Sequence, residues 1–146
     1  MLDLEFAQLS DTGRVREQNE DALGYVLPAT VTRIHSQGWV AELIEAAGGQ
    51  FLGIPGTHTT AEAVAAAEPD VLLFAWCGAG DRVPLDRVIA QRNWHHLKAV
   101  RNKNVFCIPD EYLNTPAITL LDGLACIAHA LHPQIFLYPQ RLIRLS

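Results

Sequence analysis

The sequence predicts an α/β fold: a single three-layer domain built on a mostly parallel sheet of four or five strands with right-handed crossovers. Two observations lead to this prediction. Segments with helical and strand-like patterns alternate from Gly38 onward, and the run 71–76 is apolar at every position. Such a run is typical of a central parallel strand that helices cover on both faces. The chain of 146 residues, 49% hydrophobic and 18% charged, is long and apolar enough to bury one core.

The helices are predicted from apolar spacing and from the signals at their ends. Residues 39–47 repeat apolar side chains at helical spacing, and two glycines end the pattern. The next helix, 61–67, follows Thr59 and Thr60, either of which can cap it. The same reasoning gives strands at 51–54 and 104–108, helices at 85–91 and 94–100, and a closing helix at 116–131.

The two ends of the chain are harder to interpret. Residues 4–9 alternate like an edge strand, 23–27 is a short apolar run, and 31–34 is a candidate strand or an extension of it. Either 23–27 or 31–34 must supply a strand before the first helix, because an uncovered sheet edge would invite pairing with a second chain. The tail, 137–146, interleaves apolar and basic residues and permits no assignment.

Charge and hydropathy exclude several kinds of partner. A net charge of −5 gives no electrostatic reason to bind nucleic acid or an anionic membrane. The apolar runs are far shorter than the roughly 20 residues of a membrane-spanning helix, so no membrane insertion is expected. The N-terminus lacks the pattern of a secretory signal, and the chain as written is therefore expected in the cytoplasm.

The three cysteines, Cys77, Cys107 and Cys126, are odd in number and lack the CxxC spacing of a metal or redox motif. We expect buried thiols rather than disulfides, zinc ligands or nucleophiles. The adjacent His95 and His96 diverge on a helix and are expected at the surface.

His129 and His132 have the i, i+3 spacing that suits a metal ion, but no third ligand is apparent in the sequence. No cofactor and no metal are therefore predicted.

Four motifs follow one another between about residues 37 and 136: GWVAELIEAAGG, PDV with a Cys-Gly loop after it, W-x-x-L-x-A-V-R-N-x-x-V-F, and L-L-D-G-L closing with A-L-H-P. In this order they resemble the C-terminal lobe of ABC-transporter substrate-binding proteins of the cobalamin and iron-siderophore type. The resemblance implies a Rossmann-like lobe of a two-lobed receptor, here without its partner lobe. Its ligand would be a corrinoid or a ferric siderophore, and its protein partner an ABC permease.

The same resemblance implies which residues face the ligand. They come from loops at the carboxyl ends of the strands, and the matching positions are Trp76, Cys77, Gly78 and Tyr112. A ring and backbone amides suit a large, flat, partly apolar ligand. The alternative for Trp76 is core filling, and for Tyr112 a ring packed on the edge of the sheet.

Glu62 matches the position at which these receptors present a carboxylate to the permease. Its alternative role is to complement the helix dipole from the first turn.

A second motif, residues 10–22, is similar to the opening motif of the PP2C-type metal-dependent Ser/Thr phosphatases. The resemblance implies metal-centre roles for Glu20 and Asp21 and phosphate binding by Arg16. Nothing after Pro28 supplies the remaining metal ligands of those enzymes. We therefore interpret residues 1–36 as a strand and turn that pack on the α/β domain of 37–136, and the chain as a chimera of the two families.

The sequence thus predicts a non-enzymatic ligand-binding lobe, incomplete by itself and able to pair as a homodimer in which a second copy replaces the absent lobe. A fragment of a metal-dependent phosphatase and an orphan domain without activity are the alternatives.

Overall fold

The computed structural model describes residues 22–27, 30–33, 39–52, 54, 59–76, 78–114 and 117–146, and the side chains among them from residue 40 onward. In chain order the elements are β1 (Ala22–Leu27), β2 (Thr30–Arg33), α2 (Trp39–Ala46), β3 (Gln50–Phe51), α3 (Ala61–Ala67), β4 (Val71–Ala75), α4 (Leu85–Gln91), the 3₁₀ turn η1 (Trp94–His96), α5 (Lys98–Arg101), β5 (Val105–Cys107), the 3₁₀ turn η2 (Asp110–Tyr112), α6 (Leu120–Leu131) and β6 (Ile143–Arg144).

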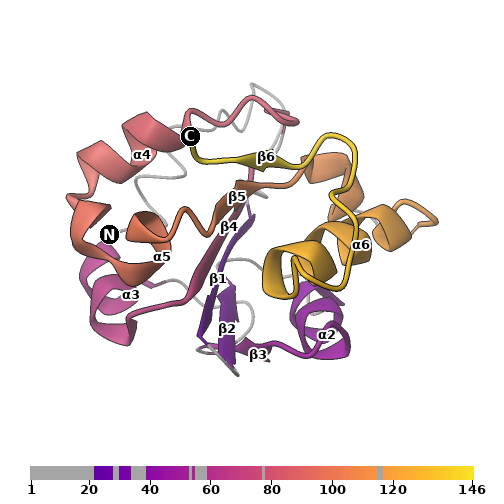
Figure 1. Cartoon of the computed structure of the whole chain (residues 1–146), viewed down its shortest axis with the longest axis horizontal. Coiled ribbons are helices and arrows are strands. Elements are labelled where there is room, and N and C mark those ends of the chain that lie inside the picture. The colour runs from indigo at the N-terminus through magenta and orange to yellow at the C-terminus, as the bar shows by residue number, and fades with distance from the viewer. Residues whose placement is uncertain are drawn as a thin grey trace, which may run out of the picture.

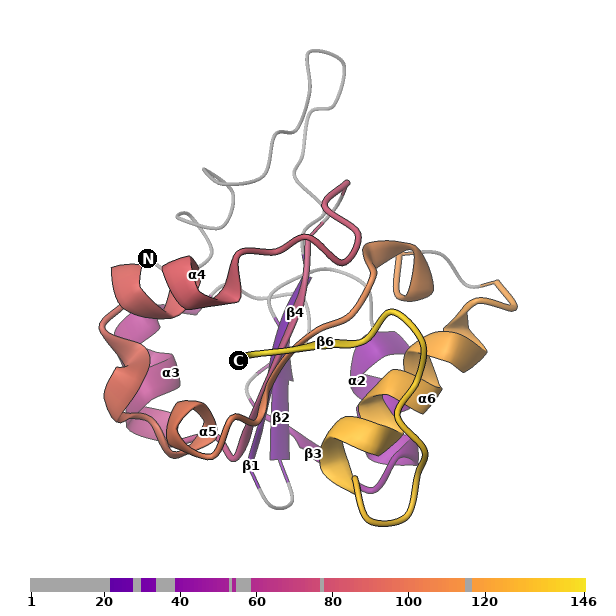
Figure 2. The same cartoon turned by 45° about the horizontal axis from the view of Figure 1, so that its top comes forward.

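Three layers make up the domain, as the sequence predicted. The sheet is the middle layer, with α3, α4 and α5 on one face and α2 and α6 on the other (Figure 1). Turning the molecule separates the two helical layers more clearly and shows β6 crossing toward the C-terminus (Figure 2). The predicted α/β class is therefore confirmed.

The sheet itself corrects the prediction of four or five mostly parallel strands. Its strand order is β2-β3-β1-β4-β5-β6, and β2 also pairs with β1. Only β4 with β5 and β2 with β3 run parallel, whereas β1 is antiparallel to β2, β3 and β4. Within the described residues the sheet is thus mixed and six-stranded.

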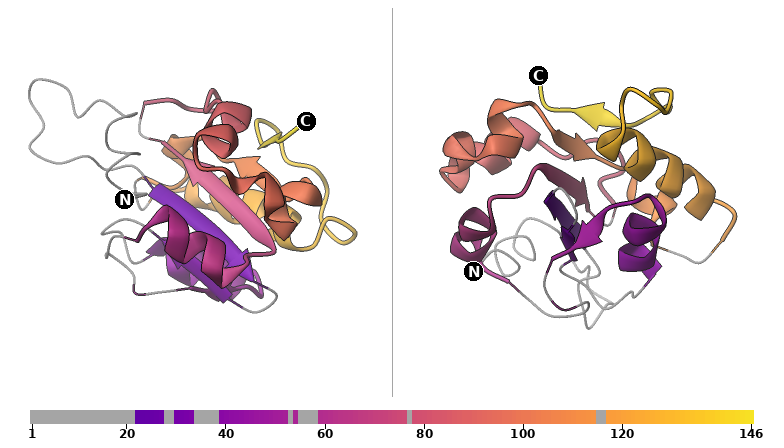
Figure 3. Two further views of the ribbon diagram at one scale, coloured as in Figure 1. Left: turned by 90° about the vertical axis from the view of Figure 1, so that its left-hand side faces the viewer. Right: turned by 60° about the horizontal axis from the view of Figure 1, so that its bottom comes forward.

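The prediction failed because it derived strand direction from burial. Helices on both faces bury a strand whichever way it runs, so the apolar run of β4 reports its two-sided cover and not the direction of its neighbours. β1 lies beside β4 with five residues in register, from Ala22 opposite Ala75 to Val26 opposite Val71 (Figure 3). Both segments considered for the strand before the first helix, 23–27 and 31–34, contribute residues to strands of the sheet.

Alternate side chains of the central strands belong to two separate hydrophobic cores. Leu72 and Phe74 of β4 point to the core under α3, α4 and α5, together with Val105 of β5. Leu73 of β4 and Phe106 of β5 point to the opposite core, under α2 and α6. This period of two confirms that 71–76 and 104–108 are interior strands lying side by side.

The closing helix begins later than predicted. Residues 117–119 form a turn, and α6 starts at Leu120 rather than at 116. The buried face of α6 includes Gly123, Cys126 and Ile127, whereas Leu121 is exposed. Pro116 itself lies outside the described residues.

The C-terminal tail, left unassigned from the sequence, is an integral part of the domain. β6 adds to the free edge of β5, with Ile143 opposite Cys107, and the amide of Leu145 donates to the carbonyl of Val105 at 2.9 Å. Leu142 enters the core under α2 and α6, and Leu145 enters the other core. The tail therefore closes one sheet edge and contributes to both faces.

Among the helices that the structure describes, none has the length and apolarity needed to cross a bilayer.

Candidate functional site

The loops that follow β4 and β5 lie together at one edge of the sheet. The two strands are parallel and in register, with Phe74 opposite Cys107, so their carboxyl ends coincide. The amide of Ile108 extends the pairing by donating to the carbonyl of Phe74 at 2.8 Å. Open α/β sheets place ligand sites at such carboxyl ends. We call the turn 78–81 and the turn 110–112 the rim loops.

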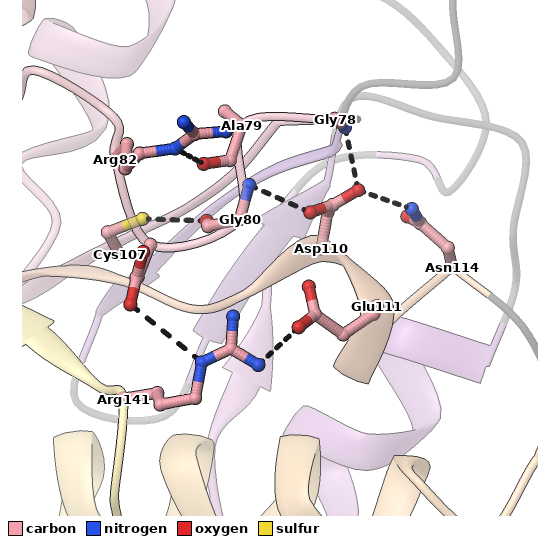
Figure 4. A network of polar contacts seen from close by, with 10 residues as sticks. Gly78, Ala79, Gly80, Arg82, Cys107, Asp110, Glu111, Asn114 and Arg141 are labelled. Carbon is pink, nitrogen blue, oxygen red and sulfur yellow. Dashed lines mark hydrogen bonds and ion pairs between the residues drawn. The ribbon is translucent and has the colours of Figure 1, made fainter.

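The carboxylate of Asp110 joins the two rim loops. The amide of Gly78 donates to Oδ2 at 2.8 Å, and the amide of Gly80 donates to Oδ1 at 3.0 Å (Figure 4). Asn114 Nδ2 also donates to Oδ2, at 3.0 Å. Asp110 is only 8% exposed, so these bonds replace the water that a buried carboxylate has lost. Asp110 therefore fixes where the turn after β4 stands.

The backbone of the turn after β4 explains its glycines. Gly78 and Gly80 have φ values of +77° and +58°, a region in which residues with a Cβ are disfavoured. Among the residues that the structure describes, none lies within 4 Å of a Cβ built on Gly78, and Gly78 is exposed. Gly78 thus lies where the sequence placed a ligand-facing backbone.

Two further residues predicted to face the ligand, Trp76 and Cys77, precede Gly78. Trp76 is 5% exposed and belongs to the core under α3, α4 and α5, so its side chain fills the core, as the alternative interpretation held. Its carbonyl accepts from the amide of Ala79 at 3.0 Å, which starts the turn. Cys77 lies outside the described residues.

Tyr112 stands at the rim, half-buried, and packs partly against the core under α2 and α6. The carbonyl of Tyr112 is held against α6, because a Cβ added to Gly123 would lie 2.5 Å from that oxygen. Gly123 is therefore what lets the helix approach η2 so closely. Both interpretations of Tyr112, edge packing and ligand contact, agree with a ring in this position.

Arg141, from the tail, joins the site and was not anticipated from the sequence. Its Nη1 donates to a carboxylate oxygen of Glu111, and its Nε lies 3.8 Å from Oδ2 of Asp81. Its guanidinium carbon is 5.7 Å from the centroid of the Tyr112 ring, within the range of a cation–π contact. The hydrogen bond that Arg141 donates to Glu111 is the main reason that the pKa of Arg141 is raised, so its charge is constant.

The thiols near the site are unreactive by environment. Cys107 is fully buried and donates to the carbonyl of Gly80 at 3.5 Å. Burial raises its pKa to about 11, and burial likewise raises the pKa of Cys126 to about 12. Nucleophilic chemistry needs the thiolate, so neither residue is a nucleophile near neutral pH. The prediction of buried thiols is confirmed for both.

Glu62 is exposed in the first turn of α3, where the sequence placed it. Thr60 caps the helix by accepting from the amide of Ala63 at 3.1 Å, which decides between the two predicted caps. Hydrogen bonds from the backbone, and then from Thr60, lower the pKa of Glu62. Its carboxylate is thus ionised and accessible, which satisfies both the dipole role and a docking role.

Two histidines, His129 and His132, hold the tail and α2 against α6. His129 Nδ1 is 2.8 Å from the carbonyl of Phe136, and His132 Nε2 is 2.9 Å from the carbonyl of Ala47. His95 and His96 are exposed, as predicted. The part of the chain that the structure describes holds no group of three or more His, Cys, Asp or Glu side chains suited to a metal ion. Arg16, Glu20 and Asp21 lie outside that part.

The sequence pointed to the loops after β4 and β5, but it did not indicate Asp110 and Arg141, whose contacts connect these loops. Asp110 carries one readable signal, because it is an acidic residue directly after a buried strand and a proline. Arg141 carries none, because its place depends on the tail folding back along β5.

Comparison with known proteins gives one match. Residues 14–112, more than half of the chain, match the family model described as periplasmic binding protein. No curated protein and no solved structure matches the chain. The matched range includes both rim loops and begins inside the stretch that resembles a phosphatase motif. The comparisons support neither that phosphatase resemblance nor a chimeric origin.

Proposed function

Because the chain belongs to the periplasmic binding protein family, whose members bind ligands and are not enzymes, we propose that it is a ligand-binding lobe related to the cobalamin and iron-siderophore receptors of ABC transporters. The family implies a small-molecule ligand and a transporter as the general partners. A corrinoid or a ferric siderophore is the specific ligand class of the proposal. The site is the rim formed by Gly78 and Tyr112.

One observation carries the proposal. Two loops from neighbouring parallel strands are tied together by Asp110, and they present an exposed backbone at Gly78 and a ring at Tyr112 on the same edge. A corrinoid or siderophore is large, and much of its surface is apolar or carbonyl-bearing. An aromatic face supplies contact area with little loss of side-chain entropy, and an exposed turn lets a broad ligand approach the backbone.

Calorimetric titration tests the proposal directly. Cyanocobalamin and a ferric hydroxamate siderophore are titrated separately into the wild-type chain and into Tyr112→Ala and Tyr112→Phe. Y112A removes the ring and is expected to weaken binding about 5- to 30-fold, equivalent to about 1–2 kcal/mol of buried apolar contact. Y112F keeps the ring and serves as the matched control, with affinity within about threefold of wild type. An absence of heat with both ligands at high micromolar concentration would remove the proposal.

Glu62 extends the proposal to the transporter. Its ionised, accessible carboxylate suits docking onto basic residues of a permease, where charge pairs govern orientation and rate of association. Stimulation of ATP hydrolysis by a reconstituted corrinoid permease is the readout. E62Q is expected to reduce it, and E42Q, which alters an exposed first-turn carboxylate of α2, is not. Equal effects of the two variants would contradict docking through Glu62.

Self-association is the remaining part of the proposal. Ile118 and Leu121, between η2 and the first turn of α6, are 78% and 62% exposed. Apolar side chains in such positions favour contact with a second copy standing in for a partner lobe. Light scattering during size-exclusion chromatography should give a dimer mass for the wild type and a monomer mass for the double variant I118E/L121E. A wild-type monomer at every concentration would remove this part alone.

A further inference from the structure

Arg141 occupies an unusual backbone position at the end of a well-anchored turn. Its φ is +64°, in the left-handed region that residues with a Cβ rarely adopt. The turn is fixed on both sides. Tyr138 Oη donates to the carbonyl of Leu142 at 2.9 Å, Tyr138 packs edge-on against His129 at 4.7 Å between ring centroids, and Leu142 is 2% exposed. The surrounding structure therefore holds Arg141 in a strained conformation.

From this position the guanidinium reaches both rim loops. It contacts Glu111 in the turn after β5 (Figure 4) and Asp81 at the end of the turn after β4. It also lies over the ring of Tyr112. A Cβ added to Gly80 would stand 3.7 Å from Arg141 Nη2, so the arginine also fills the space beside the glycine turn. Three segments far apart in the sequence meet at one side chain.

The energetics of these contacts do not favour a role in stability. Arg141 and Glu111 are each 45% exposed, and Asp81 is 36% exposed. Exposed ion pairs contribute little to folding and are weakened by salt. A left-handed non-glycine residue opposes folding at the same position. What the arginine does supply is geometry, because one rigid, planar cation connects two carboxylates on separate loops.

We propose that Arg141 is a positioning residue of the candidate site: a clasp, contributed by the C-terminal tail, that sets the separation of the two rim loops. The inference rests on the proposed function in so far as those loops present Gly78 and Tyr112 to a ligand. Asp110 joins the loops from the buried side, and Arg141 joins them from the exposed side. The tail beyond α6 thereby becomes part of the binding machinery rather than an extension of the fold.

Amide hydrogen exchange tests the clasp without any ligand. R141G removes the guanidinium and also relieves the left-handed strain, so it separates positioning from stability. In R141G we expect amides of the rim loops, 78–81 and 110–112, to exchange at least about tenfold faster, with the melting temperature equal to or above that of wild type. R141K, which offers a point charge to one carboxylate at a time, should give intermediate exchange.

R144A is the matched control, because Arg144 is a tail arginine that binds the carbonyls of Asn102 and Lys103 instead of the rim. It should leave rim exchange at the wild-type rate. Sodium chloride at 1 M should bring wild-type rim exchange toward that of R141G and leave R141G unchanged. Unchanged rim exchange in R141G, or faster exchange spread over the whole chain, would overturn the clasp.

Titration with cyanocobalamin separates the clasp from the proposed function. If the wild type binds and R141G binds about tenfold more weakly, the result supports both the clasp and the proposed ligand-binding function. Faster rim exchange in R141G with no wild-type binding supports the clasp and removes the proposed function. Wild-type binding that R141G and R144A leave equally strong shows that the loops need no clasp for the ligand, and overturns the inference.

Discussion

Replacement of Asp110 by alanine gives the sharpest test of how the site is assembled. The variant deletes the acceptor of two backbone hydrogen bonds, from Gly78 at 2.8 Å and Gly80 at 3.0 Å, and of one side-chain bond from Asn114 at 3.0 Å. A hydrogen bond to a charged acceptor contributes about 1.5–3 kcal/mol. Gly78 is exposed and its freed amide can bind water, so the three losses do not add in full.

We expect the free energy of unfolding to fall by about 2–4 kcal/mol in D110A, which lowers the melting temperature by about 5–15 °C in a chain of this size. D110N keeps one acceptor oxygen but turns an NH₂ group toward a backbone amide, and it should lose about 1–3 kcal/mol. Urea unfolding followed by circular dichroism measures both variants.

The control is E45A, which removes an exposed carboxylate of α2 and should stay within about 0.5 kcal/mol of wild type. Amide exchange should speed up first at Gly78 and Gly80 in D110A, because these donors lose their partner. A D110A variant as stable as E45A, with unchanged exchange in the turn after β4, would refute the assignment of Asp110 as the link between the rim loops.

Three further predictions concern packing, titration and capping. G123A places a methyl group against the carbonyl of Tyr112 in η2, where a Cβ would stand at 2.5 Å. Urea unfolding should show a loss of about 1–3 kcal/mol in the free energy of unfolding. No loss would mean that α6 and η2 can move apart freely. Cys107 and Cys126 should resist iodoacetamide at pH 8 and react only after denaturation, as read by peptide mass spectrometry. Their folded pKa values are raised, to about 11 and about 12, so the stability they provide is complete below about pH 9 and is lost as the pH rises toward those values. Above pH 9 the free energy of unfolding of the double alanine variant should therefore fall less steeply with pH than that of wild type. Equal slopes for the two proteins would contradict the raised pKa values. T60A should lower the free energy of unfolding by about 1 kcal/mol because it removes the cap on α3, and T59A should lower it much less. Equal losses in the two variants would disprove the assignment of the cap.

The sequence was most informative where one pattern had one structural cause. The run 71–76 is apolar on both faces because helices cover both faces, and it forms the interior strand β4. The helices α3 and α4 begin and end at the predicted residues, since threonine and proline mark their starts and apolar spacing marks their length. The resemblance to a two-lobed receptor identified the family that the comparison also gives.

The sequence was least informative where the cause was tertiary. Nothing local distinguishes a parallel from an antiparallel neighbour, so the direction of β1 could not be inferred. The tail reads as mixed apolar and basic residues because its two buried leucines, Leu142 and Leu145, serve different cores, which breaks any simple period. Asp110 and Arg141 act through partners about 30 residues away, and such partnerships are visible only once the strands are paired.

The close approach at Gly123 has a mechanical consequence. With no side chain between them, α6 and the carbonyl of Tyr112 have no room to slide past each other. At the far end of the same helix, His132 holds the carbonyl of Ala47 at the end of α2. A displacement of the turn 110–112 would therefore move α6 with it, and through His132 it would reach the end of α2 in the same helical layer.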